Sequence, residues 1–247
     1  MKIVLRYSLL LAVVYLPSLA FSMGIDSMMK VAENGVTNFS VTSTAEYREF
    51  IQVGITELNV ENGDIAKTPY SRENIDKWSL LVRPAKTVIE PGMSKLFKVE
   101  HSPTPLNTSE KDYVYQLSFI PTPYFAEGEP VTHSVKVAMG FAPIVIVPAK
   151  EDRPIAYKME HKQDELMLVN NGSTYLRTVL DACPDNKQTE DRDKCSTVVY
   201  ALAGRHLPIA LSDEMKAASR IKVELSTHNM DYEEMFELKP GQTSTNQ

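Results

Sequence analysis

The residues best suited to covalent chemistry are Cys183 and Cys195, the only cysteines of the 247-residue chain. Eleven residues separate them, and the loop between them is polar and highly charged. This spacing matches neither a C-x-x-C redox pair nor a zinc knuckle. In an exported protein, an even number of closely spaced cysteines indicates a disulfide. We therefore expect a structural disulfide, worth about 3 kcal/mol for the loop that it closes.

The other reactive side chains do not assemble a recognisable catalytic or metal site. No histidine lies two or four residues from another, as zinc ligands on a strand or helix would; the five are His101, His133, His161, His206 and His228. The short carboxylate clusters at 191–193 and 233–234 are typical of solvated faces. The chain contains no G-x-S-x-G, G-x-G-x-x-G or Walker motif. We expect no catalytic residue, no metal site and no cofactor.

The start of the chain is typical of a secretory signal peptide. Lys2 and Arg6 form a positive beginning, an uncharged and mostly apolar stretch covers 7–21, and small residues follow at the expected cleavage positions. Pro17 interrupts the apolar stretch, which falls short of the roughly 20 residues that a membrane-spanning helix needs. We predict a cleaved signal peptide over 1–22.

The mature chain would be acidic. Its net charge would change from −6 to −8, because Lys2 and Arg6 leave with the signal peptide. Nucleic acids and anionic membrane surfaces bind basic patches, so this charge argues against both as partners. No later segment is both long and apolar enough to span a bilayer. We therefore expect neither nucleic-acid binding nor membrane insertion.

The rest of the sequence predicts short strands separated by turns. The clearest is 113–119, where aromatic and apolar residues occupy every second position and would share one face. A charged segment flanked by prolines, 149–153, indicates a hinge. We predict an all-β chain of two β-sandwich domains, 23–148 and 154–247.

One predicted strand is unusually long. Residues 135–147 are apolar or small with a single charge, and the stretch ends at Pro148. As a strand it would span about 43 Å, whereas ordinary strands have about 5–6 residues. Such a strand at a sheet edge invites pairing with another chain. Gly140 and Pro143 suggest a kink, after which Ile144–Val147 would belong to the protein's own core.

In order along the chain, several segments resemble the periplasmic chaperones of pilus assembly, the PapD-like superfamily. The resemblance is greatest to the alternate chaperones of CS1/CFA-class fimbriae. It is carried by 78–92 (WSLLVRPAKTVIEPG), 113–119 (YVYQLSF), 135–148, 166–172 (LMLVNNG) and the cysteine pair, and covers nearly all of the chain after residue 22. It implies two immunoglobulin-like domains set as a boomerang, with the last strand of the first domain facing the cleft.

The resemblance also implies a role for the long strand. These chaperones lend it to a pilin subunit that lacks the last strand of its own immunoglobulin-like fold, a form of strand addition. Because side chains alternate along a strand, Val135, Val137, Met139 and Phe141 would enter the subunit's core. Each fully buried apolar side chain contributes about 1.5–3 kcal/mol. The chaperone would act in the periplasm and deliver the subunit to an outer-membrane usher.

The resemblance further implies basic cleft residues that hold the subunit's C-terminal carboxylate. Lys30 stands where the basic residue of the first strand is expected, and a charge-assisted hydrogen bond would suit that role. The last strand departs from the family pattern, because Pro143 and Val147 stand where basic residues are expected. Arg177 or Arg153 could substitute for them, although nothing in the sequence requires it.

Two other functions stay open from the sequence. A structural pilin or adhesin subunit would share the export signal and the strands, but a pilin usually has one domain and a longer apolar N-terminal extension. A generic exported immunoglobulin-like binding protein would contact its ligand through loops. The sequence also leaves open whether the free protein forms an oligomer that caps its own long strand.

Overall fold

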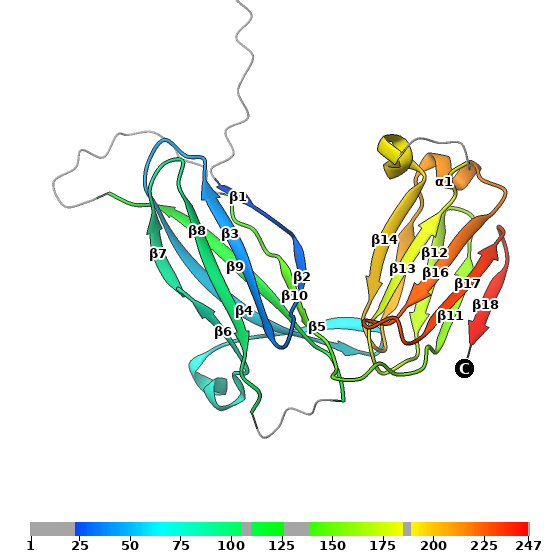
Figure 1. Ribbon diagram of the computed structural model, residues 1–247, viewed down its shortest axis with the longest axis horizontal. Coiled ribbons are helices and arrows are strands. Elements are labelled where there is room, and N and C mark those ends of the chain that lie inside the picture. The colour runs from blue at the N-terminus through cyan, green and yellow to red at the C-terminus, as the bar shows by residue number, and fades with distance from the viewer. Residues whose placement is uncertain (1–22, 105–109, 126–138, 185–188, 247) are drawn as a thin grey trace, which may run out of the picture.

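The structure is a computed structural model that describes residues 23–104, 110–125, 139–184 and 189–246. The predicted signal peptide lies outside the described residues. The chain is all-β, and its strands form four sheets paired into two sandwiches. Figure 1 shows the two sandwiches set at an angle to each other, as in a boomerang. The predicted fold class is therefore confirmed.

The N-terminal sandwich consists of two sheets in which most neighbouring strands are antiparallel. The first has the order β1-β3-β8-β6: Met23–Ile25, Val36–Ser43, Ser94–His101 and Leu80–Arg83. The second has the order β2-β10-β9-β4-β5: Met29–Val31, Ile144–Val147, Tyr113–Pro123, Glu49–Glu61 and Asp64–Pro69. Strand β7, Lys86–Ile89, pairs with β4, and the 3₁₀ helix η1 covers Arg72–Lys77.

The core of this sandwich follows from the alternation predicted for β9. Tyr113, Tyr115, Leu117 and Phe119 are all buried on one face of the strand. The ring of Phe119 packs edge-on against Phe97 with 5.0 Å between ring centroids. The period-two pattern therefore identified the inner face of the central strand correctly.

The C-terminal sandwich has four strands in each sheet. One has the order β15-β12-β11-β18: His206–Ala210, Glu165–Asn170, Tyr157–His161 and Thr243–Asn246. The other has the order β14-β13-β16-β17: Ser196–Ala201, Leu176–Asp181, Ile221–Ser226 and Glu233–Leu238. The short helix α1 covers Asp213–Ala217, and the 3₁₀ helix η2 covers Thr189–Lys194.

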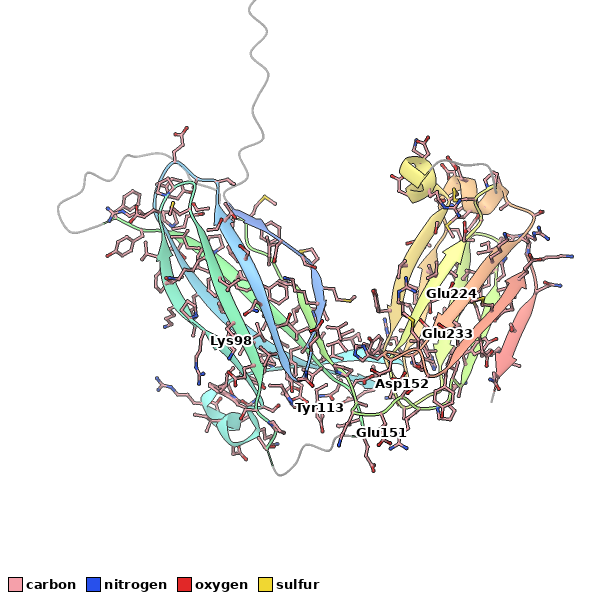
Figure 2. All side chains as sticks on the ribbon, in the orientation of Figure 1. Lys98, Tyr113, Glu151, Asp152, Glu224 and Glu233 are labelled. Atoms are coloured by element: carbon pink, nitrogen blue, oxygen red, sulfur yellow. A yellow bond between two sulfur atoms is a disulfide. The ribbon has the colours of Figure 1, made fainter. Side chains whose placement is uncertain are left out.

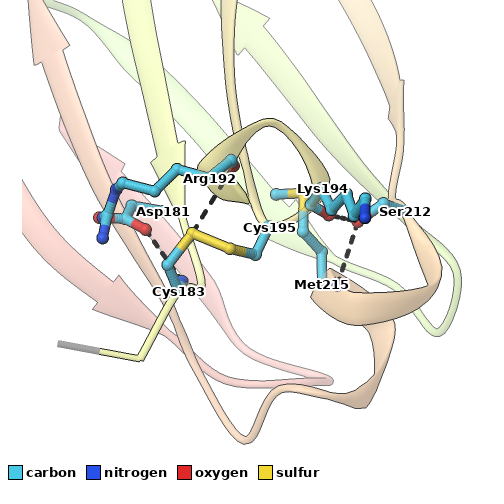
Figure 3. The surroundings of a disulfide bond; sticks show 7 residues. All are labelled: Asp181, Cys183, Arg192, Lys194, Cys195, Ser212 and Met215. Carbon is cyan, nitrogen blue, oxygen red and sulfur yellow. Dashed lines mark hydrogen bonds and ion pairs between the residues drawn. A yellow bond between two sulfur atoms is a disulfide. The ribbon is translucent and has the colours of Figure 1, made fainter. Parts of the chain in front are cut away.

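The predicted disulfide joins Cys183 to Cys195, whose Cα atoms are 5.0 Å apart (Figure 3). It ties the end of β13 to the residue after η2. Asp181 strengthens the same corner, because it accepts the N–H of Cys183 at 2.9 Å and forms an ion pair with Arg192. The prediction of a structural disulfide is confirmed.

Candidate functional site

Strand β10 has a neighbouring strand on each side. It pairs in parallel with β2 and antiparallel with β9. Val145 and Val147 are buried in the core of the N-terminal sandwich, whereas Ile144 and Ile146 pack on the other face of the sheet. The four residues of β10 therefore belong to the protein's own structure.

In the segment just before β10, the chain is paired with a neighbouring strand on one side only. Phe141 still exchanges backbone hydrogen bonds with Phe119 of β9, at 2.8 and 3.1 Å. On the opposite side, the N–H of Ile144 donates to the carbonyl oxygen of Met28 at 2.9 Å. Beyond that point, no strand among the described residues pairs with this edge.

The edge opens because the first strand changes sheets. Its first part, β1, pairs with β3 in the other sheet, and only its second part, β2, reaches β10. Between them, the N–H of Asp26 donates to Ser40 of β3 at 3.1 Å. Since Phe141 bonds to β9 with both of its own backbone groups, the backbone of Gly140 and Ala142 points toward the open side.

Among the described residues the long strand is not continuous: it is interrupted near Gly140 and Pro143, as the sequence suggested. Regular strand covers only Ile144–Val147, and Phe141 forms an isolated bridge. Pro143 interrupts the ladder because proline has no N–H to donate. Gly140 lies so close to β9 that an added Cβ would be 2.5 Å from the carbonyl oxygen of Phe119.

Two of the four residues predicted to enter a partner, Val135 and Val137, lie outside the described residues. Met139 is 55% exposed. Phe141 is half-buried and packs against the N-terminal core, on the face that it shares with Val145. Insertion of these side chains into a subunit stays a prediction, and the structure gives Phe141 a contact inside the protein as well.

An apolar cluster joins the two sandwiches, and we call it the junction cluster. Its buried members are Leu58, Val114, Ile146 and Tyr175. Around them pack Met29, Val31, Ile65, Ile144, Tyr200 and Leu202. The tyrosines and Leu202 come from the C-terminal sandwich, and the other residues come from the outer face of the sheet that contains β10. The junction therefore begins directly beside the open edge.

Polar contacts flank the junction cluster. The carboxylate of Asp112 accepts the N–H of Ala149 at 2.8 Å and the N–H of Tyr175 at 2.5 Å. Burial raises the pKa of the Asp112 carboxyl above its usual value, although these two donors act in the opposite direction. One side chain thus connects the N-terminal sandwich, the linker and the C-terminal sandwich.

The linker is also attached to the C-terminal sandwich. Asp152 is buried, and its carboxylate accepts the hydroxyl of Thr227 at 2.6 Å and the N–H of Asn229 at 2.8 Å. Figure 2 places Tyr113, Glu151 and Asp152 at the junction between the domains. The segment predicted to be a hinge is therefore held at both ends.

The hairpin formed by β4 and β5 was missed from the sequence and makes a second attachment. Its turn, Asn62-Gly63, has positive φ angles of 53° and 86°, as tight hairpin turns require. Figure 1 shows the hairpin, in cyan, extending toward the C-terminal sandwich. There Arg205 donates to the carbonyl of Gly63 and to Asp64, the latter at 2.6 Å. The Asn-Gly dipeptide between two strand-like runs was the signal that could have identified this hairpin.

The predicted anchor Lys30 is engaged within its own domain. Its ammonium group donates to Asp26 at 2.7 Å and to the carbonyl of Asn38 at 2.6 Å, and it lies 5.1 Å from the centre of the Phe39 ring. The neighbours of Lys30 on β2 pack into the junction cluster, so Lys30 points to the opposite face of the sheet. Its role as an anchor stays a prediction.

The other basic candidates lie elsewhere. Arg177 lies opposite Tyr200 of the junction cluster in the pairing of β13 with β14, and its guanidinium is 3.9 Å from Glu224. Arg153 is 4.0 Å from Glu110. Lys67, which the sequence did not single out, donates to Gln116 at 3.4 Å, beside Ile144. Arg177 and Lys67 therefore lie on the sheet faces that form the junction, whereas Lys30 lies on the opposite face of its sheet.

Among the described residues, no group of three or more His, Cys, Asp or Glu side chains could hold a metal ion. The same part of the chain contains no helix that is long and apolar enough to cross a membrane.

Comparison with known proteins gives a family match and a set of similar folds. The model of the family described as the CS5 fimbrial protein N-terminal domain matches residues 25–148. No curated protein matches the sequence of this chain. Many solved structures do match the fold, at low sequence identity.

Three of these structures illustrate the similarity. The class 5 fimbriae chaperone CfaA is 16% identical, with 89% of this chain and 99% of that chain covered and a TM-score of 0.50. The CsuC–CsuE chaperone–tip subunit complex of Acinetobacter baumannii gives the same identity, coverage and TM-score. The complex of the SafA pilin with the SafB chaperone of Salmonella enterica is 11% identical, with 89% and 96% covered and a TM-score of 0.53. The expected fold of two immunoglobulin-like domains is thereby confirmed.

Proposed function

We propose, since the chain belongs to the family of the CS5 fimbrial protein N-terminal domain, that it is a periplasmic chaperone of fimbrial assembly. It binds pilin subunits, completes their fold with a strand of its own and delivers them to an outer-membrane usher. It needs no cofactor and no catalytic residue, because folding and exchange of the subunit drive the cycle.

The observation that carries this proposal is the open edge beside Phe141. The chain there is held on one side by Phe119, at 2.8 and 3.1 Å, while its other side has no strand neighbour among the described residues. A sheet edge fixed on one side is what an incoming strand needs, because the main-chain groups are already aligned. The subunit would extend the sheet at this edge.

The side chains ahead of the edge supply the apolar contacts. In an extended conformation every second residue points to the same face, and these residues are Val135, Val137 and Met139. Three buried side chains of this size contribute several kcal/mol, at about 1.5–3 kcal/mol each. Met139 is 55% exposed, so its burial against a subunit would remove apolar surface from water.

A basic side chain near the junction would hold the subunit's terminal carboxylate. We favour Arg177 over Lys30 for this role, because Lys30 is engaged by Asp26 and Asn38. An arginine offers a carboxylate two parallel donors.

The test is co-expression with candidate subunits from the same strain. Tagged wild type should co-purify with a stoichiometric subunit from the periplasm, and Val137→Glu should not, because a buried unpaired charge opposes insertion. Ala138→Glu is the matched control: it adds the same charge one residue on, at the opposite face, and should retain the subunit. Circular dichroism checks that each variant is folded.

If wild type retains no subunit, or Val137→Glu retains it as well as wild type, the donor-strand proposal is wrong. A generic exported immunoglobulin-like binding protein would then be the better description.

A further inference from the structure

Asp112 occupies a position through which the two sandwiches and the linker are connected. It directly precedes β9, the central strand of the sheet that contains the open edge. One carboxylate oxygen accepts the N–H of Ala149, in the linker, and the other accepts the N–H of Tyr175, just before β13. Three segments that are far apart in the sequence therefore meet at one side chain.

Only a carboxylate can make this connection. Both donors are backbone N–H groups, so the side chain must offer two acceptors, one at each oxygen. An asparagine in the same place would offer one acceptor and would turn an NH₂ group toward the second N–H. Hydrogen bonds to a charged acceptor are also roughly twice as strong as neutral ones.

The residue that Asp112 holds in the C-terminal sandwich is itself inserted into the N-terminal one. The ring of Tyr175 is buried in the junction cluster against Leu58, Val114 and Ile146. Its hydroxyl is 2.8 Å from Nδ1 of His228, within its own sandwich. The backbone and the ring of Tyr175 thus both contact the N-terminal sandwich. Rotation of Tyr175 relative to that sandwich would break both contacts.

We propose that Asp112 is a positioning residue that sets the angle between the two domains, and with it the space in which a subunit is held. The consequence for subunit binding rests on the proposed chaperone function, whereas the geometry of the Asp112 contacts does not. The attachment of Asp152 to the loop at Thr227 and Asn229 fixes the far end of the linker. Bending is therefore controlled at the Asp112 end.

When Asp112 is lost, the contact between Arg205 and the β4–β5 turn still connects the two domains. Arg205 donates to Gly63 and Asp64, and the N–H of His206 donates to Gly63 at 3.0 Å. These hydrogen bonds and the apolar contacts of the junction cluster remain when Asp112 is lost, and they keep the domains together. Loss of Asp112 should consequently widen the range of angles without separating the domains.

The experiment compares Asp112→Asn with Asp181→Asn. Asp181 is a matched control, because it also accepts a backbone N–H, that of Cys183, but lies entirely within the C-terminal sandwich. Small-angle X-ray scattering of the monomer should show a broader distance distribution for Asp112→Asn and an unchanged one for Asp181→Asn. Subunit retention should fall about tenfold for Asp112→Asn only, because binding must then narrow a wider range of domain angles.

The proposal is overturned if Asp112→Asn scatters like wild type, whether or not subunit retention changes. Asp112→Glu gives a second reading should the asparagine variant fail to fold: its longer side chain displaces the carboxylate and should also broaden the distribution. Failure of the proposed function shows separately, as loss of retention already in wild type, and the scattering comparison still decides the role of Asp112.

Discussion

Phe141 is bonded through its backbone to Phe119 on one side, and on the other side it faces an edge that the first strand leaves open. This relationship links the core of the N-terminal sandwich to its proposed function. The aromatic side chain packs inward, so the position of the edge is set by the same contacts that stabilise the domain. A partner strand would meet a surface that is already in place.

Replacing Gly140 by alanine should destabilise this edge. An added Cβ would be 2.5 Å from the carbonyl of Phe119, so β9 or the segment before β10 would have to shift. Such overpacking typically costs about 1–3 kcal/mol. Urea denaturation measures the change, and Gly24→Ala is the control, because its nearest atom lies at 4.0 Å. Equal stability of the two variants would contradict the close approach.

Removing the disulfide should weaken the C-terminal sandwich. Replacement of both Cys183 and Cys195 by serine opens the loop that contains η2, and we expect a loss of about 3 kcal/mol in the free energy of unfolding. Reduced wild type should denature at the same urea concentration as this double variant. A double variant as stable as oxidised wild type would show that the ion pair of Asp181 with Arg192 is sufficient to hold this corner.

The stability of the protein should fall in mild acid because of the partly buried side chain of His101. Burial lowers the pKa of His101, whose ring stacks on Tyr113 at 5.3 Å, below its ordinary value of 6.5. The unfolded chain therefore binds a proton that the folded protein excludes. The free energy of unfolding should be greatest above about pH 6.5 and should decrease as the pH falls toward the lower, folded pKa.

Urea midpoints at several pH values measure this dependence. His101→Phe keeps an aromatic ring against Tyr113 and should reduce the slope, whereas His206→Gln, at an exposed position, should leave it unchanged. His161 is buried, and burial likewise lowers its pKa, so part of the slope should persist in the His101 variant. An unaltered slope in His101→Phe would contradict this assignment.

Substitution of Arg177 should weaken subunit retention without affecting folding. The side chain is partly exposed and its ion pair with Glu224 is long, at 3.9 Å, so its removal costs little stability. If it holds a terminal carboxylate, Arg177→Ala should reduce retention about tenfold. Lys158→Glu, at an exposed position in the other sheet of the same sandwich, should retain the subunit normally. Full retention by Arg177→Ala would remove this residue from the anchor.

Local patterns in the sequence identified the elements whose signal lies within a few residues. The alternation from Tyr113 to Phe119 specified the inner face of β9, because side chains on a strand alternate whatever the sheet around it. The cysteine pair predicted its own disulfide from spacing and export alone. The β4–β5 hairpin carried an equally local signal in Asn62-Gly63 and could have been found in the same way.

The sequence by itself therefore determined the all-β class, the two sandwiches, the disulfide and the apolar stretch that ends at Pro148. Only the tertiary structure decided where that stretch is paired and where its edge is open, because this depends on the first strand crossing between sheets. It also decided that Lys30 is engaged by Asp26 and that Asp112 joins the domains. These contacts connect residues distant in the sequence, and those of Asp112 use backbone N–H groups, which leave no pattern in residue type.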